Sequence, residues 1–81
     1  MDRSQILSKI NELIRDVFDE DDLVVTDETE AEDVDEWDST NHVRLIVAIE
    51  EAFHVQFTTD EITAPENVGQ LVDLVASKLK D

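Results

Sequence analysis

Apolar residues recur every three or four positions in three stretches of the chain, and this spacing predicts three amphipathic helices. The first runs from about Asp2 to Phe18, the second from Ser39 to about Phe53, and the third from about Asn67 to Lys80. Helix-capping residues support these limits. Asp38 precedes the second stretch as an expected N-cap, and Asn67 with Gln70 three positions on resembles a capping box.

The segments between these helices have no sustained period. Residues 19–38 hold twelve carboxylates and no Lys or Arg. A loop this long is unusual in a compact domain and is often functional. The run Val24-Val25-Thr26 could form a short strand, but we reject a strand there because the chain offers no second one. Residues 58–62 suit one short helical turn, and Pro65 then interrupts the chain.

We therefore expect an all-α four-helix bundle with three longer helices, one short helix and a long first loop. One Gly and one Pro in 81 residues fit such a bundle, and the length fits a single domain spanning residues 1–81. The apolar stripes predict a core that includes Ile6, Ile10, Leu13, Val17, Val43, Ile46, Ile49, Phe53, Ile62, Val68, Leu71, Val72 and Val75.

Charge narrows the classes of partner. Six basic and 22 acidic residues give a formal net charge of −16. Such a surface repels nucleic acid and anionic membranes, and it favours proteins with basic docking surfaces. The chain has no cysteine and no apolar run long enough for membrane insertion. Its first residues lack the pattern of a signal peptide, so we expect a cytoplasmic location.

The pair Asp38-Ser39 is the strongest candidate for chemistry. It joins the acidic loop to the second helix, so the Ser39 hydroxyl should lie beside free backbone N–H groups. These groups and the helix dipole favour a phosphate there, so Ser39 could carry a phosphodiester-linked group. On spacing alone, an ordinary serine at a helix start is the better interpretation, because Asp-Ser pairs are common.

Two other sites are not supported by the spacing. Asp38, Ser39 and His42 could suggest a small hydrolase, but no glycine elbow or oxyanion hole accompanies them. The acidic run at residues 19–22 lacks the alternating ligands and the Gly of a calcium-binding EF-hand loop. We interpret that run as a solvated acidic loop, and we predict no metal site.

Asp38-Ser39, followed by a helix that ends in Ile-Glu-Glu-Ala-Phe at residues 49–53, closely resembles acyl carrier proteins. The resemblance covers essentially the whole chain. It implies that Ser39 receives 4'-phosphopantetheine from coenzyme A through a phosphopantetheinyl transferase that uses a divalent metal. The thiol of the group would then carry acyl or aminoacyl intermediates as thioesters between partner enzymes. The carrier itself would catalyse nothing, and such carriers usually act as monomers.

The chain departs from the family pattern just after the serine. Thr40 stands where the family usually has Leu, and residues 41–44 lack the usual acidic residues and include Arg44. These differences favour a specialised stand-alone carrier over one of the housekeeping fatty-acid pathway. His42 and Arg44 either contact the phosphate or a partner, or are simply solvated. The expected docking surface comprises Thr40, Asn41, Arg44, Val47 and Glu51.

Two further interpretations stay open. Trp37, the only Trp, would anchor the acidic loop to the core, which is the interpretation that we favour, and it could also shape the surface around the prosthetic arm. The chain as a whole could instead be an acidic protein-interaction module without a prosthetic group. In that case Ser39→Ala would leave its function intact.

Overall fold

The structure is a computed structural model, and it describes residues 2–79. Within this range the chain is all-helical and contains no strand, as the sequence predicts. The third long helix ends at Leu79, and the expected last residue, Lys80, lies outside the described residues. The elements in order are α1 (Arg3–Phe18), a 3₁₀ turn η1 (Ala31–Asp33), α2 (Ser39–Phe53), α3 (Thr59–Thr63) and α4 (Val68–Leu79).

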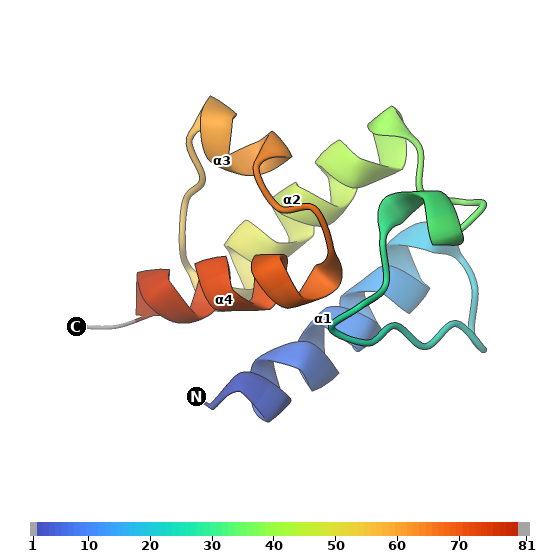
Figure 1. Cartoon of the computed structure of the whole chain (residues 1–81), viewed down its shortest axis with the longest axis horizontal. Coiled ribbons are helices and arrows are strands. Elements are labelled where there is room, and N and C mark those ends of the chain that lie inside the picture. Colours follow the sequence, from blue (N-terminus) through green and yellow to red (C-terminus); the bar gives the residue numbers. More distant parts are fainter. Residues whose placement is uncertain (1, 80–81) are drawn as a thin grey trace.

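The helix α1 packs against both α2 and α4. The short α3 lies on the other side of α2 and α4 from α1 (Figure 1). A single cation helps to hold α3 in place. Lys78 of α4 pairs with Glu61 of α3 at 2.7 Å, and its ammonium lies 5.4 Å from the centre of the Phe57 ring.

The core confirms most of the predicted apolar positions and corrects one. Val43 was expected inside, but its side chain is 53% exposed, and Leu45 is buried instead. Leu13, Val17 and Ile62 are only partly buried against the core. The buried apolar residues are Ile6, Ile10, Ile14, Phe18, Val25, Val34, Leu45, Ile46, Ile49, Phe53, Val68, Leu71, Val72 and Val75.

Side-chain hydrogen bonds cap the starts of α1 and α4, and a left-handed residue ends α2. Asp2 forms a full capping box with Gln5 at the start of α1. Asn67 accepts a hydrogen bond from the backbone N–H of Gln70 at 2.8 Å, which confirms it as a cap, whereas the Gln70 side chain accepts from the Glu66 N–H. His54 ends α2 in the left-handed conformation with φ of 58°, a position that glycine usually takes.

The first loop is held to α1 by side chains, not by a sheet. Asn11 is buried, accepts a hydrogen bond from the Val25 N–H at 2.7 Å and donates to the Val25 carbonyl at 3.1 Å. Arg15 donates to the Leu23 carbonyl at 2.8 Å. These bonds satisfy backbone groups that a neighbouring strand would otherwise satisfy, so the acidic loop is ordered without one.

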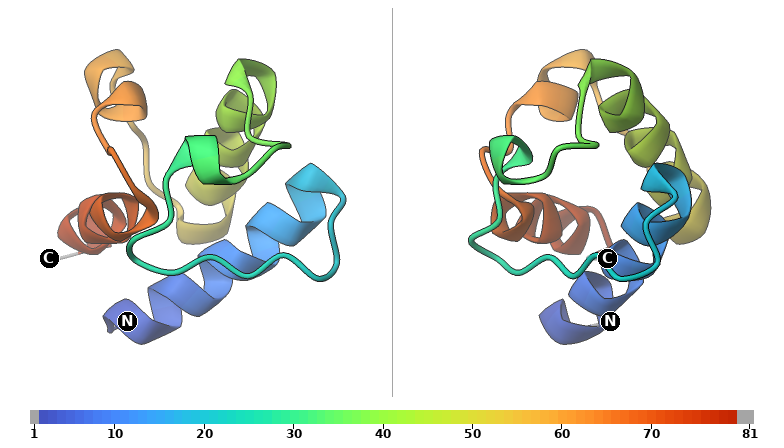
Figure 2. Two further views of the ribbon diagram at one scale, coloured as in Figure 1. Left: turned by 45° about the vertical axis from the view of Figure 1, so that its right-hand side comes forward. Right: turned by 90° about the vertical axis from the view of Figure 1, so that its right-hand side faces the viewer.

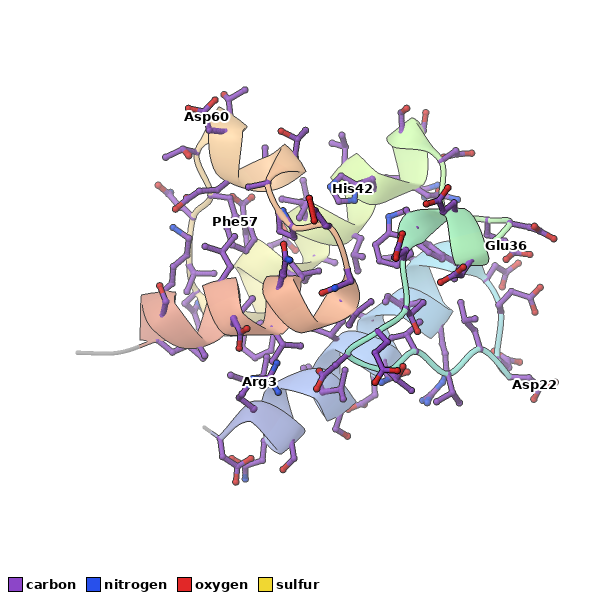
Figure 3. All side chains as sticks on the ribbon, in the orientation of Figure 1. Arg3, Asp22, Glu36, His42, Phe57 and Asp60 are labelled. Atoms are coloured by element: carbon purple, nitrogen blue, oxygen red, sulfur yellow. The ribbon has the colours of Figure 1, made fainter. Side chains whose placement is uncertain are left out.

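The middle of the first loop lies beside the start of α4 (Figure 2). The Val68 N–H donates to the Thr29 carbonyl and the Gly69 N–H to the Asp27 carbonyl, both at 2.9 Å. Arg3, which lies between the start of α1 and α4 in Figure 3, bonds Asp27 at 3.2 Å and Asp73 at 2.7 Å. Its bonds to these two carboxylates, Asp27 foremost, raise the pKa of the Arg3 guanidinium.

Candidate functional site

Ser39 is the first residue of α2 and is exposed. Asp38 is the N-cap, as predicted, because its backbone is extended and its carboxylate accepts a hydrogen bond from the Asn41 N–H at 2.8 Å. The Asp38 carbonyl accepts the His42 N–H, also at 2.8 Å. The cap thus fixes where the helix starts, and it places Ser39 on the first turn.

Two backbone donors remain free beside the serine. The N–H groups of Ser39 and Thr40 have no acceptor among residues 2–79, whereas those of Asn41 and His42 are both used by Asp38. Free donors at a helix start combine with the helix dipole to favour an anion. The site can therefore stabilise a phosphate attached to the Ser39 hydroxyl.

A cavity of about 420 Å³ opens next to Ser39. It lies between the start of α2, the end of α3 and the first loop, and its lining combines apolar side chains with four polar residues. An apolar group tethered at Ser39 would lose part of its contact with water on entering it. The lining residues are Ala31, Trp37, Asp38, Ser39, His42, Val43, Ile62 and Thr63.

Trp37 anchors the end of the first loop, the interpretation that the sequence favoured. Its ring packs edge-to-face on Phe18 at the end of α1, with 5.5 Å between ring centroids. Its indole N–H donates to His42 Nδ1 at 3.0 Å. The same ring lines the cavity beside Ser39, so Trp37 also shapes the surface around the serine.

His42 connects the loop, α2 and α3. Because its Nδ1 accepts the Trp37 N–H, its Nε2 carries the proton and donates to the Ile62 carbonyl at 2.7 Å. Figure 3 shows His42 on α2 and Glu36 at the end of the first loop. Neither His42 nitrogen is available as a base for Ser39. His42 is therefore not simply solvated, because both of its ring nitrogens already have partners within the fold.

The expected docking residues divide into two groups. Thr40, Arg44, Val47 and Glu51 are exposed and recur at helical spacing on one face of α2. Asn41 differs, because it is partly buried and its side chain donates to the Glu36 carbonyl at 2.8 Å. It closes the turn before the helix and does not share that face.

The acidic loop reaches the edge of the site. Glu20 follows α1, and a hydrogen bond shared with Glu36, together with the repulsion between the two carboxylates, raises the pKa of Glu20. Residues 2–79 contain no group of three or more His, Asp or Glu side chains arranged to hold a metal ion. In the same range, every helix is too short or too polar to cross a membrane.

No protein-family model matches the chain. It is, however, 37% identical over 75 residues to an acyl carrier protein of Rubrobacter xylanophilus, covering 93% of each chain. It is 32% identical over 80 residues to an acyl carrier protein of Thermosynechococcus vestitus, covering 98% of each.

A solved structure agrees with these relatives. The solution NMR structure of holo acyl carrier protein from Geobacter metallireducens superposes with a TM-score of 0.84 and 44% identity, over 90% of this chain and 84% of that one. The helical architecture of that protein is the architecture described above. The sequence relatives and the structural neighbour agree over nearly the full length, so the chain belongs to the acyl carrier protein family.

Proposed function

We propose that Ser39 bears 4'-phosphopantetheine and that residues 1–81 act as one carrier domain for acyl or aminoacyl thioesters. The observation that carries this proposal is the exposed Ser39 on the first turn of α2, beside two free backbone N–H groups. The family supports it, since the neighbour from Geobacter metallireducens is described as a holo protein. On this proposal the chain itself catalyses no reaction.

The residues at the site fit the group. Its phosphodiester is an anion, and the free N–H groups of Ser39 and Thr40 suit an anion. The nearest carboxylate, Asp38, faces the Asn41 N–H, and this bond offsets part of its charge. When bound, the group supplies a thiol that forms thioesters. This chain's residues position the attachment oxygen and provide the apolar cavity next to it.

The exposed face of α2 is the proposed docking surface for the partners. These are a phosphopantetheinyl transferase and the enzymes that load and process the cargo. Val43 and Val47 are 53% and 46% exposed, and they offer apolar contact close to Ser39. Arg44 and Glu51 flank them with opposite charges. The acidic first loop nearby would steer partners with basic surfaces toward this face.

Intact mass spectrometry tests the attachment. The purified protein is incubated with coenzyme A, magnesium and a broad-specificity phosphopantetheinyl transferase, beside Ser39→Ala and Ser4→Ala. Ser4 is a matched control, because it also lies on a first helical turn behind an aspartate cap. We expect a gain of one phosphopantetheine on the wild type and on Ser4→Ala, and none on Ser39→Ala.

Failure of the folded wild type to gain mass, with a cognate transferase as well, would reject the proposal. The acidic interaction module would then be the better account. That module predicts binding driven by charge alone, unaffected by Ser39→Ala and abolished by high salt.

A further inference from the structure

Arg44 carries a positive charge that the fold does not use. It is exposed, and it forms no ion pair with any carboxylate among residues 2–79. The sequence has no other Lys or Arg between Arg15 and Lys78. Lys78 and Arg3, by contrast, form ion pairs, and Arg15 donates to a loop carbonyl. Arg44 is thus a free cation within a strongly acidic part of the chain.

Local structure gives no reason for a cation at this position. None of the residues three and four places away on either side is acidic, and these residues are Thr40, Asn41, Val47 and Ala48. Arg44 therefore lacks the carboxylate neighbours that stabilise a cation along a helix. It also lies in the first half of α2, whereas the helix dipole favours cations at the C-terminal end. Its charge remains available to a partner.

The charges of α2 have a fixed order on the face that points away from the core. At about 100° per residue, four exposed residues lie within about 60° of one another around the helix axis. Buried Leu45 and Ile49 lie on roughly the opposite side. We call the four exposed residues the docking stripe, and they are Thr40, Arg44, Val47 and Glu51.

Along the docking stripe the positive charge comes first and the negative charge last. Arg44 is the closer of the two to Ser39, and Glu51 follows seven residues later, about 10 Å further along the axis. Val47, 46% exposed, lies between them. The helix dipole would favour the reverse order, with the carboxylate near the N-terminus. Helix stability therefore does not explain the order.

We propose that Arg44 selects partner enzymes, the phosphopantetheinyl transferase among them, whose docking surface carries an acidic side chain facing Arg44 and a basic one facing Glu51. The inference rests on the proposed attachment at Ser39, because it assumes that partners approach this serine along α2. A partner with a uniformly basic surface is attracted by the acidic first loop but meets a like charge at Arg44. The docking stripe thus discriminates among enzymes that all recognise acidic carriers.

Exchange of the two charges tests the proposal. The double variant Arg44→Glu, Glu51→Arg keeps the composition and the net charge of −16 but reverses the order. Transfer of phosphopantetheine from coenzyme A by the cognate transferase is measured at low ionic strength. We expect kcat/KM to be about tenfold lower than for the wild type. The thermal midpoint should be equal or higher, because the new order suits the helix dipole, so the loss cannot come from unfolding.

A pair of single substitutions gives the sign of the charge that faces Arg44. Arg44→Gln and Lys9→Gln each remove one positive charge, but Lys9 lies on α1, outside the docking stripe. We expect kcat/KM to fall about threefold for Arg44→Gln and to stay unchanged for Lys9→Gln. High salt should reduce the difference between the two variants, because it screens the charges.

Three results would overturn the proposal. The exchanged variant could react as fast as the wild type, or Arg44→Gln could react faster, which would place a basic group opposite Arg44. Equal losses for Arg44→Gln and Lys9→Gln would show that net charge alone matters. Failure of the wild type to gain phosphopantetheine would instead reject the attachment at Ser39, so the two proposals fail in different ways.

Discussion

Asn11 is the polar side chain on which the order of the first loop depends. It is 8% exposed and bonds both backbone groups of Val25, at 2.7 and 3.1 Å. Asn11→Leu keeps the branched shape and the number of heavy atoms but leaves the N–H and the carbonyl of Val25 without partners. We expect unfolding free energy to fall by about 2–3 kcal/mol, since a buried unpaired polar group costs about 1–3 kcal/mol.

Urea unfolding followed by circular dichroism measures this change, with Asn41→Leu as the control. The Asn41 side chain makes one hydrogen bond, to the Glu36 carbonyl near the surface, so its loss should matter less. Equal effects of the two substitutions would show that Asn11 does not have the special role assigned to it.

Asn11 also shows a limit of sequence reasoning. An asparagine within a helical stripe gives no sign of its partner, because that partner is the backbone of a residue 14 positions away. The pairing of Trp37 with His42 was missed for a related reason. The two side chains are five residues apart, and the bond depends on how the loop enters α2.

At the level of the elements, α4 begins against the backbone of the first loop, and Gly69 makes this possible. A Cβ at this position would lie 2.8 Å from the Asp27 carbonyl oxygen, which accepts the Gly69 N–H. Gly69→Ala should therefore lower stability by about 1–3 kcal/mol through overpacking. This would occur although alanine favours a helix by about 1 kcal/mol over glycine.

Thermal denaturation of Gly69→Ala and of Ser77→Ala separates the two effects. Ser77 is exposed on the same helix, so its replacement should leave the midpoint unchanged or slightly raised. A Gly69→Ala protein as stable as the wild type would mean that the loop does not press on the start of α4.

The helices themselves were predictable, because their apolar periods and caps are local features of the sequence. Asp38 and Asn67 mark the starts of α2 and α4 in sequence and in structure alike. The sequence predicted less well which apolar residues of α2 are buried. Val43 lies three positions before Ile46, yet the buried side includes Leu45, and Val43 faces the cavity beside Ser39. Which apolar edge of α2 is covered depends on tertiary packing, including that of α1 against α2.

Across the whole molecule, the excess of acid should make stability depend on pH. Shared hydrogen bonds with neighbouring carboxyls raise the pKa of Glu20, next to Glu36, and of Glu30, next to Glu32. Groups with a raised pKa stabilise the fold below their unfolded pKa, and this contribution is lost as pH rises through the folded pKa. Stability should thus fall from mildly acidic pH toward neutrality.

Two other carboxyls act in the opposite direction. The ion pair with Lys78 lowers the pKa of Glu61, and the bond from the Gln5 N–H lowers the pKa of Asp2. Their contribution is present above the unfolded pKa and is lost as pH falls through the folded pKa. Stability should therefore pass through a maximum on the acid side of neutrality.

Thermal midpoints across this range check the expectation, with higher values at about pH 5 than at about pH 7.5. Added salt should raise the midpoint at neutral pH, because it screens the repulsion that follows from a net charge of −16. In the double variant Glu20→Gln and Glu30→Gln, the thermal midpoint should rise less when the pH is lowered from neutral to about 5. A midpoint that instead increases steadily from acid to neutral pH would contradict this assignment of the pKa shifts.

The most direct test of the central claim, that Ser39 is the attachment point, is fragment-ion mass spectrometry of the protein after treatment with coenzyme A and the transferase. The expected result is one phosphopantetheine, located on Ser39 and released by cleavage of its phosphodiester. Modification at Ser4, Ser8, Ser77 or any threonine, with Ser39 unmodified, would contradict the claim.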